Sequence, residues 1–384
     1  MSDRVVQVCL DYAPSSGGTT RSVDNFHTQL KSRVISFSSP AHFDTILQES
    51  ENPFFEHICA ERSWLGRDYR YASAARLQNA ENAIRNASLL ICHMLWRHHI
   101  VWATRVAKAN GVPYWVIPHG SLDPYVLKTR PLRKRVWMEM FGRHLLSDAA
   151  RVIFATDRER EKAELTGIPM RSEVVQWPVI PVDVGSHMQA RESVRCSLGI
   201  SRDARVLIYI GRLHPMKRPL ETVQAICRSG SRNLHLILCG PDEVISRQEC
   251  VEAAPPSFRD QIHPVGAVYG DMKYDYMLAS DALILQSQRE NFSYVVADAL
   301  ACGLPVIVSP NVDLAPMIEP FCCGWILKNM ADESIDAAIK EFIALPFATL
   351  ESMGARGQEF ANSQLTEENF QRKIRALVET DKRN

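Results

Sequence analysis

Two acidic residues in one short segment have the chemistry and spacing of a ligand site. Glu290 follows the buried strand expected at residues 281–285, and Asp298 lies eight positions further on, in an apolar helical pattern. Ligands of open parallel sheets bind at the carboxyl ends of the strands, and a helix N-terminus offers free N–H groups to a phosphate. If residues 290–298 are mostly helical, roughly 12 Å separates the carboxylates. That spacing suits a ligand with hydroxyls at both ends and a diphosphate between them, such as a nucleotide sugar. The alternative is an ordinary strand–turn–helix whose acids are solvated.

A basic loop follows a second predicted strand, at Val206–Ile210. It begins at Gly211, carries Arg212 and Lys217, and reaches Pro219, which suits the first turn of a helix. Cations around a tight loop can wrap a diphosphate and stabilise the negative charge that grows on a leaving group. A solvated basic loop is the competing interpretation.

Two further loops follow predicted strands in the first half of the chain. Gly17 and Gly18 lie at a strand-to-helix turn, where the missing Cβ atoms let the backbone approach a ligand. No Gly-x-Gly-x-x-Gly is present, so the dinucleotide fingerprint is absent. His93 and His119 each end or follow a strand. For His93 a core or capping role is the alternative, whereas His119 precedes a glycine at the expected ligand edge.

The bulk composition excludes several classes of protein. A chain of 384 residues exceeds one comfortable hydrophobic core, so two domains are expected. Lys+Arg and Asp+Glu are equal at 44 each, which argues against a nucleic-acid partner. The ten cysteines form no Cys-x-x-Cys pair, and the histidines show no metal-ligand spacing. With no signal-peptide pattern at the N-terminus, a cytoplasmic protein is expected.

Short apolar runs alternate with helical patterns along the whole chain, which is typical of α/β folds with parallel sheets. Two prolines in the segment at residues 177–183 interrupt this alternation and indicate a linker. We therefore predict an N-terminal domain at 1–177, a linker at 178–189 and a C-terminal domain at 190–365. A final helix is expected within residues 366–384.

The acidic segment resembles the Glu-x7-Glu signature of retaining glycosyltransferases of family 4, including its Ala-Cys-Gly-Leu-Pro-Val-Ile continuation. The resemblance implies the GT-B fold, in which two doubly wound Rossmann-like domains face each other across a cleft and the last helix returns to the first domain. It implies that Glu290 contacts the donor sugar and Asp298 the ribose, with Phe292 and Ser293 also at the donor. Asp298 departs from the usual Glu by one methylene, which shortens its reach.

Three other segments carry the same resemblance. The basic loop is similar to the family's Gly-Arg-Leu-x-x-x-Lys motif, which implies that Arg212 and Lys217 hold the donor phosphates. Residues 118–124 resemble the Pro-His-Gly-x-Leu-Asp-Pro block of family 4 enzymes that build surface polysaccharides, which implies that His119 faces the donor sugar. Residues 93–96 resemble their His-Gly-Leu-Trp block, with Met94 in place of Gly. A Gly-Gly loop such as Gly17-Gly18 lies beside the donor diphosphate in this family.

The resemblance implies a retaining hexosyltransferase that uses a UDP- or GDP-sugar, needs no metal or other cofactor, and acts on a saccharide or lipid-linked saccharide. A nucleotide-sugar epimerase, a glycoside phosphorylase and a non-catalytic binding protein remain alternatives. The basic stretch at residues 128–135, with aromatic residues after it, suggests peripheral contact with the inner face of the plasma membrane. An ordinary helix with a solvated basic face explains it equally. Donor base, sugar, acceptor, linkage and oligomeric state are not specified by the sequence.

Overall fold

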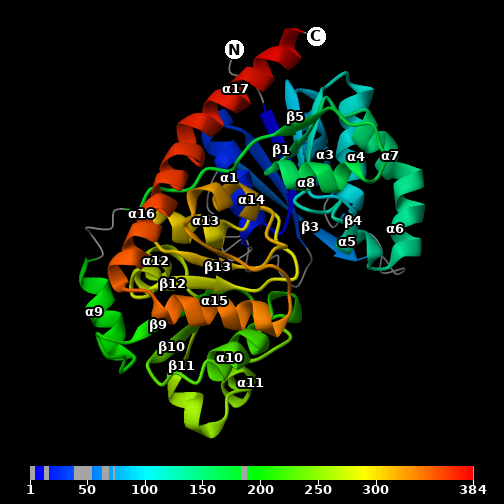
Figure 1. The fold of residues 1–384 in the computed structure, drawn as a ribbon. Coiled ribbons are helices and arrows are strands. Elements are labelled where there is room, and N and C mark those ends of the chain that lie inside the picture. The colour runs from blue at the N-terminus through cyan, green and yellow to red at the C-terminus, as the bar shows by residue number, and fades with distance from the viewer. Residues whose placement is uncertain are drawn as a thin grey trace. The chain divides into compact units, whose positions relative to one another are not determined.

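The computed structural model describes residues 5–12, 17–38, 54–62, 69–71, 74–182 and 188–383. Its contacts divide the chain into two units (Figure 1). The N-terminal unit comprises Met1–Trp177 and Phe370–Asn384, and the C-terminal unit comprises Pro178–Asn369. Part of the predicted linker, residues 183–187, lies outside the described residues.

The N-terminal unit is built on a sheet of order β4-β3-β2-β1-β5-β6-β7-β8, in which all neighbours are parallel except β3 and β4. Its strands are β1 Val5–Leu10, β2 Arg33–Ser38, β3 Phe55–Arg62, β4 Tyr69–Tyr71, β5 Leu89–His93, β6 Tyr114–Ile117, β7 Arg151–Phe154 and β8 Ser172–Val174. Its helices are α1 Gly18–Leu30, α3 Ala74–Arg85, α4 His98–Ala109, α5 Pro124–Lys128, α6 Pro131–Trp137, the π-helix η2 Met138–Gly142, α7 Arg143–Ser147 and α8 Asp157–Glu164.

The C-terminal unit has a parallel sheet of order β11-β10-β9-β12-β13-β14. Its strands are β9 Arg205–Ile210, β10 Leu234–Cys239, β11 Ile262–Gly266, β12 Ala282–Leu285, β13 Val306–Val308 and β14 Gly324–Ile326. Its helices are α9 Met188–Ser197, α10 Pro219–Arg228, α11 Arg247–Glu252, α12 Gly270–Leu278, α13 Tyr294–Ala301, α14 Ala315–Ile318, α15 Asp332–Ala344 and α16 Phe347–Gln364, with the 3-10 turns η4 Pro215–Lys217, η5 Pro256–Gln261 and η6 Glu319–Phe321.

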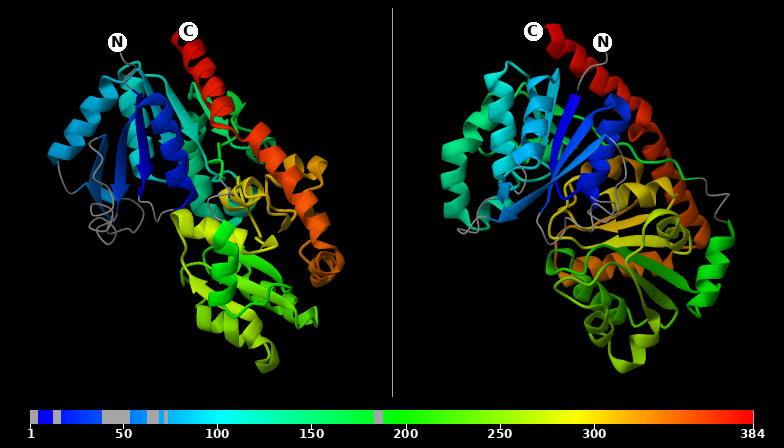
Figure 2. Two further views of the ribbon diagram at one scale, coloured as in Figure 1. Left: turned by 90° about the vertical axis from the view of Figure 1, so that its left-hand side faces the viewer. Right: turned by 180° about the vertical axis from the view of Figure 1, so that it is seen from behind.

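The central strands of both sheets are continuous apolar runs because helices cover both faces of each sheet (Figure 2). All five residues of β5 and all four of β12 are buried. The strand order also changes direction once in each sheet. The strands that follow β1 or β9 are added on one side of it, and the later strands, which begin with β5 or β12, are added on its other side. In doubly wound sheets the ligand binds at such a switch point, beyond the carboxyl ends of the two strands. The strand order alone therefore predicts that ligands bind at the loops after β1, β5, β9 and β12.

The last helix, α17 Glu367–Arg383, packs on the N-terminal unit along most of its length (Figure 1). The Phe370 ring contacts the rings of Phe26 and Trp177, with centroids 5.2 and 6.1 Å away. Near the other end, Asp381 accepts a hydrogen bond of 2.7 Å from Trp115 Nε1 and forms an ion pair of 2.8 Å with Arg151. Apolar contacts and a partly buried ion pair thus hold this helix at both ends.

Among the described residues, the structure places eleven strands within a few residues of the bounds that the apolar runs of the sequence predict, namely 5–10, 34–37, 89–93, 114–117, 152–155, 174–176, 206–210, 234–239, 282–285, 306–308 and 324–327. The sequence analysis missed β3, β4 and β11. In β11 the residues His263 and Pro264 interrupt the apolar pattern, and Pro264 can be accommodated because β11 is an edge strand. Among the described residues, no helix has the length and apolar character needed to cross a membrane.

Candidate functional site

The switch point of the C-terminal unit brings the basic loop and the acidic segment together. The basic loop leaves β9 at Gly211, and its position is set by Gly240, where a Cβ atom would lie 1.8 Å from the Gly211 carbonyl oxygen. The backbone N–H of Gln288, in the loop after β12, donates to the Met216 carbonyl at 2.8 Å. This hydrogen bond ties the loops after β9 and β12 to each other, directly beside Lys217.

Lys217 and Glu290 form an ion pair at this junction. Both side chains are mostly buried, with exposed fractions of 15% and 11%. The same oxygen, Glu290 Oε1, accepts a hydrogen bond of 2.7 Å from Ser287 Oγ. The two residues that the sequence predicts at opposite parts of one ligand are therefore in direct contact, and the carboxylate is held by two donors.

Arg212 lies at the start of the same basic loop but is more exposed. Its guanidinium forms an ion pair with Glu243, with Nη1–Oε distances of 2.7 and 2.9 Å, and 54% of the side chain is exposed. An exposed ion pair of this kind is worth only about 0–1 kcal/mol. Arg212 can therefore exchange Glu243 for a more highly charged partner at little cost.

The condition under which the spacing of roughly 12 Å was derived, a helix that includes Glu290, is not met. Helix α13 begins only at Tyr294, because Glu290 pairs with the segment before α14: its N–H donates to Asn311 O, and its carbonyl accepts from Asp313 N. Ser293 then turns the chain through the left-handed region, with φ 57°. Glu290 thus belongs to a loop that precedes the helix, and the 12 Å spacing derived for a continuous helix does not apply.

Phe292 and Ser293 lie between the two acids. The Phe292 side chain is 2% exposed and packs edge-on against Tyr294, so it anchors the loop. Ser293 Oγ is buried and has no hydrogen-bond partner among the described residues. It precedes the first turn of α13, whose leading N–H groups have no partner within the helix. A buried hydroxyl and a helix N-terminus together suit an anionic ligand.

Asp298 lies in the middle of α13, and only 2% of its side chain is exposed. Its Oδ2 atom forms an ion pair of 2.6 Å with Lys273 Nζ, from α12. The sequence analysis did not identify Lys273, since a lone lysine in a short helix carries no signal. Asp298, which stands where the family signature has the longer Glu, therefore has a basic partner inside the C-terminal unit.

In the N-terminal unit, Gly17, Gly18 and His93 lie at the corresponding switch point between β1 and β5, and His119 follows the next strand, β6. Gly17 has φ 83°, a conformation that favours glycine, and Gly18 begins α1. His93 ends β5 and is completely buried, while His119 follows β6 and is partly buried. Their imidazoles stack, and His93 Nδ1 lies 3.0 Å from His119 Nε2. Residues 13–16 of the predicted glycine-rich turn are outside the described part of the chain.

The loop that carries His119 is held by a buried carboxylate that the sequence analysis missed. Glu159, 5% exposed, accepts hydrogen bonds from Gly120 N at 2.6 Å and from Ala155 N at 2.8 Å. Trp96, the last residue of the segment that resembles the His-Gly-Leu-Trp block, could serve as an apolar platform for an acceptor sugar or simply pack in the core; it packs against Trp137 and donates to Ser121 O at 3.2 Å. Its contacts therefore support the packing role.

Left-handed backbone conformations concentrate at these strand ends. Non-glycine residues with positive φ include Asp11 after β1, Met94 and Trp96 after β5, and His119 after β6. Such conformations cost about 1–2 kcal/mol for a residue with a Cβ atom. Strained backbone of this kind is frequent at functional sites. Met94 has φ 70° and occupies the position of the glycine in the His-Gly-Leu-Trp block. A left-handed backbone favours glycine, which explains why the family block has glycine at this position.

Burial keeps the histidines of this region neutral. Desolvation lowers the pKa of His119 to about 4 and, together with the neighbouring His119, holds the pKa of His93 well below its ordinary value. His99, in α4, stacks on Phe37 and has a pKa lowered by burial to about 3. Among the described residues, no group of three His, Cys, Asp or Glu side chains is placed to hold a metal ion.

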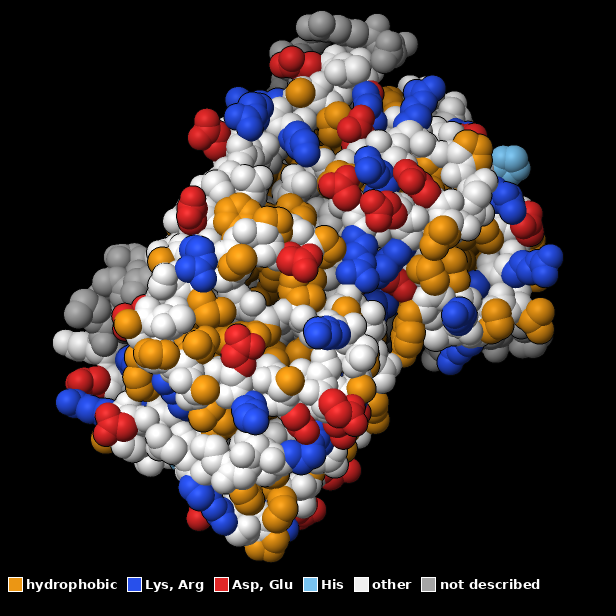
Figure 3. Space-filling view, in the orientation of Figure 1, with side chains coloured by type: hydrophobic (Ala, Val, Ile, Leu, Met, Phe, Trp, Pro, Cys, Tyr) orange, Lys and Arg blue, Asp and Glu red, His pale blue; other side chains and the backbone are white. Residues whose placement is uncertain are grey.

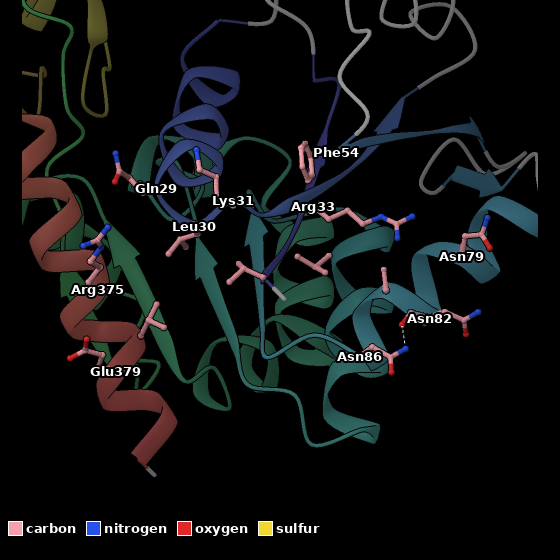
Figure 4. Close-up of a pocket in the computed structure, with 14 residues that line it drawn as sticks. Gln29, Leu30, Lys31, Arg33, Phe54, Asn79, Asn82, Asn86, Arg375 and Glu379 are labelled. Atoms are coloured by element: carbon pink, nitrogen blue, oxygen red, sulfur yellow. Dashed lines mark hydrogen bonds between the residues drawn. The ribbon is translucent and has the colours of Figure 1, made fainter. Parts of the chain in front are cut away.

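A surface cavity of about 980 Å³ lies elsewhere in the N-terminal unit (Figure 4). It is lined by the beginnings of β1 and β2, the end of α1, and polar side chains of α3 and α17, including Asn82, Asn86, Arg375 and Glu379. These are the amino ends of the strands, opposite the ends that lead to Gly17 and His119. The cavity is therefore separate from the candidate site.

Family comparisons agree with this arrangement. A family model described as glycosyl transferases group 1 matches residues 190–360, and one described as a glycosyl transferase 4-like domain matches residues 47–178. The chain belongs to the group 1 glycosyltransferases. The resemblance of its motifs to family 4 is thus confirmed, and the two matches fall on the two units.

Curated relatives of the family are distant. A D-inositol 3-phosphate glycosyltransferase of Kineococcus radiotolerans is 25% identical over 259 residues, covering 60% of this chain and 55% of the relative. A putative teichuronic acid biosynthesis glycosyltransferase of Bacillus subtilis is 25% identical over 257 residues, covering 66% and 61%. The chain spans about half the length of the first curated relatives it matches.

Solved structures show the same fold over nearly the whole chain. Sucrose-phosphate synthase from Thermosynechococcus elongatus has a TM-score of 0.73 at 18% identity, with 98% of each chain covered. HepE of Anabaena, solved in complex with UDP and glucose, has a TM-score of 0.72 at 16% identity, with 98% of this chain and 99% of that chain covered. The expected GT-B fold, with two Rossmann-like domains, is confirmed.

The buried histidines predict acid sensitivity. Because their pKa values are lowered from 6.5 in the folded state, the unfolded chain binds more protons between pH 7 and 5, and the free energy of unfolding should fall over this range. Urea denaturation followed by tryptophan fluorescence measures this, since six of the seven tryptophans precede residue 178. His99→Phe should show a smaller decrease, and equal stability of the wild type at both pH values would contradict the prediction.

Proposed function

We propose that this chain is a retaining glycosyltransferase that moves a hexose-type sugar from a nucleotide diphosphate sugar to a hydroxyl of a saccharide or glycolipid. The observation that carries the proposal is the junction after β9 and β12, where Lys217, Glu290 and the N-terminus of α13 meet. This junction has cations and the positive end of a helix dipole for a diphosphate, with a carboxylate next to them for sugar hydroxyls. The family membership supports the same chemistry.

In this proposal, Arg212 and Lys217 hold the donor diphosphate and stabilise the charge that develops on the leaving phosphate. Glu290 accepts hydrogen bonds from the sugar hydroxyls, and Asp298 accepts them from the ribose. Phe292 and Ser293 shape the loop that receives the phosphates. In the N-terminal unit, His119 contacts the reacting sugar, and the Gly17-Gly18 turn contacts the diphosphate. Glu290, which binds the sugar in this proposal, thus lies beside Lys217, and Lys217 can form an ion pair with the diphosphate instead.

The donor is proposed to be a UDP- or GDP-sugar, with UDP-sugars tested first because HepE of Anabaena was solved with UDP-glucose. A role in polysaccharide biosynthesis is supported by the putative teichuronic acid enzyme among the relatives. The rival activities separate by their products: conversion of a nucleotide sugar into its epimer without an acceptor indicates an epimerase, and transfer that depends on inorganic phosphate indicates a phosphorylase. Nucleotide-sugar binding without any turnover indicates a binding protein.

Replacing either cation should reduce turnover, and for Arg212, whose ion pair is exposed, it should do so with little loss of stability. Arg212→Ala and Lys217→Ala should each raise the barrier by roughly 2–4 kcal/mol, which is the loss expected for a preorganised group that stabilises transition-state charge. Steady-state kinetics with the preferred nucleotide sugar measures the change. Arg202→Ala is the matched control, since Arg202 is an 82%-exposed arginine of the same unit, ion-paired with Glu192. Near-normal kinetics in both variants would contradict the assignment.

Transfer is proposed to be independent of divalent metal ions, because two cations of the chain can supply the positive charge that a metal would bring. Activity should therefore persist after dialysis against EDTA. The measurement is the initial rate of sugar transfer with and without chelator. Complete loss of transfer that is restored by adding Mg²⁺ or Mn²⁺ would show that the leaving-group chemistry depends on a metal.

The two acids should differ in what they bind. Both Asp298→Asn and Asp298→Ala remove the carboxylate that pairs with Lys273, but Asp298→Asn preserves the shape of the side chain and keeps an amide oxygen that can accept from Lys273. Asp298→Asn should weaken both free UDP and the UDP-sugar by roughly 1–3 kcal/mol. Glu290→Gln should leave free UDP affinity nearly unchanged and abolish transfer. Calorimetric titration decides the matter, and an unchanged UDP affinity in Asp298→Asn would remove Asp298 from the site.

We also propose that α6 and η2 contact the cytoplasmic face of an anionic membrane. Leu132, Val136 and Met140 recur every four residues and are 79%, 58% and 62% exposed. On the opposite side of the same helices, Trp137 and Phe141 pack against the core. Exposed basic residues flank the apolar stripe, and Figure 3 shows hydrophobic and basic side chains interspersed where α6 lies in Figure 1. Apolar area combined with Lys and Arg suits an anionic lipid surface.

Vesicle sedimentation tests this surface. The wild type should sediment with vesicles that contain phosphatidylglycerol and much less with pure phosphatidylcholine, because each basic residue near the surface contributes about 1 kcal/mol. The triple variant Leu132→Ser, Val136→Ser, Met140→Ser should stay in the supernatant. Leu165→Ser, which replaces a 77%-exposed apolar residue elsewhere in the unit, is the matched control. Equal binding of the triple variant and this control would contradict the proposal.

A further inference from the structure

A chain of three hydrogen-bonded side chains runs from the interior of the N-terminal unit to its strand ends. Gln7, in the middle of β1, is completely buried, and its Oε1 atom lies 2.7 Å from His93 Nε2. The other ring nitrogen, His93 Nδ1, lies 3.0 Å from His119 Nε2. Each contact requires one donor and one acceptor, so the protons along this chain can be assigned in order.

The orientation of the Gln7 amide sets the first assignment. Its nitrogen lies 3.1 Å from the Val23 carbonyl oxygen and 2.6 Å from Ser32 Oγ. A backbone carbonyl only accepts hydrogen bonds, so this end of the amide is the NH₂ group and the other end is the oxygen. The Gln7 oxygen can only accept, and His93 Nε2 must therefore carry a proton.

The second assignment follows from the neutrality of His93. Its ring is buried and lies edge-on against Phe26, with centroids 5.9 Å apart. Burial keeps the pKa of His93 well below its ordinary value, so the ring carries one proton, which is on Nε2. Its Nδ1 atom then has a lone pair, and the proton in the contact between the two imidazoles must belong to His119 Nε2. His119 Nδ1 is left without a proton.

We propose that Gln7 and His93 are positioning residues, which hold His119 in its neutral Nε2–H tautomer so that His119 Nδ1 can accept a hydrogen bond from a hydroxyl of the bound sugar. The tautomer rests on the geometry of this unit alone. The contact with a sugar hydroxyl rests on the proposed function.

The surroundings of His119 keep its ring in this orientation. The ring stacks on His93 with an interplanar angle of 16°, and its centroid lies 6.2 Å from that of Trp177. The backbone of His119 is left-handed, with φ 49°, and the next residue is fixed by the hydrogen bond from Gly120 N to Glu159. A histidine held at one nitrogen, on one face and through its backbone presents the other nitrogen in a defined direction.

Purely structural packing is the rival explanation. It requires a buried ring at position 93, but it requires no acceptor at the position of Nδ1. His93→Phe keeps a ring and removes the acceptor, whereas His93→Asn loses the ring and places an amide oxygen near the position of Nδ1. The two variants therefore separate the hydrogen bond from the packing.

The first measurement is the tautomeric state of His119 in the free protein. The full-length chain with ¹⁵N-labelled histidine is studied by long-range ¹H–¹⁵N NMR at pH 7, with signals assigned through His93→Asn and His119→Gln. We expect the Nε2–H tautomer for both His93 and His119. An Nδ1–H tautomer or an imidazolium at His119 would overturn the proposal, whatever the activity of the protein.

The second measurement is sugar transfer by the variants. His93→Phe should reduce kcat/KM roughly tenfold, as loss of one hydrogen bond predicts, and His93→Asn should recover most of this loss. The control is His99→Phe, which replaces a buried histidine of α4 that takes no part in the hydrogen bonds between Gln7, His93 and His119. Full activity of His93→Phe would overturn the role in sugar binding. Absence of transfer by the wild type would overturn the proposed function, and with it the hydroxyl contact, while the NMR result would still decide the tautomer.

Discussion

The ion pair between Lys217 and Glu290 joins the two loops on which the candidate donor site depends. It forms because β9 and β12 are neighbours in the sheet although 71 residues separate the end of the first from the start of the second. Parallel neighbours direct their carboxyl ends to one edge, so a reversal in strand order leaves the two outgoing loops side by side. The hydrogen bond from Gln288 N to Met216 O then sets their relative position.

The contact between these opposite charges also matters while no ligand is bound. Most of the Lys217 and Glu290 side chains is buried, and either charge alone would be costly to bury at this junction. A nucleotide diphosphate would provide a new partner for Lys217, and sugar hydroxyls would provide donors for Glu290. The pair thus keeps both groups neutralised and close together, while each retains chemistry that suits one half of a nucleotide sugar.

The sequence predicts the fold well because the central strands of both sheets are parallel and buried, so that they are largely apolar runs. It predicts Arg212, Lys217, Glu290 and His119 through short motifs next to those runs. It fails where tertiary contacts decide the structure: Glu290 pairs with the segment around Val312 and so lies outside the helix that its local sequence favours. Edge strand β11 is missed because a proline breaks its pattern.

Residues that act through others are also invisible in the sequence. Lys273, Glu159 and Gln7 belong to no motif in the sequence, and only their partners Asp298, Gly120 and His93 give them a role. Gln7 interrupts an otherwise apolar strand, which is the one signal that a buried polar contact was required. Lys273 forms an ion pair with Asp298, so the charge at this position depends on two residues.

A crystal structure of the chain with bound UDP tests the central claim most directly. The account predicts that the diphosphate lies between Lys217 and the N-terminus of α13, with Arg212 released from Glu243 and the ribose hydroxyls within hydrogen-bond distance of Asp298. A nucleotide bound elsewhere, with the contact between Lys217 and Glu290 unchanged, would contradict it.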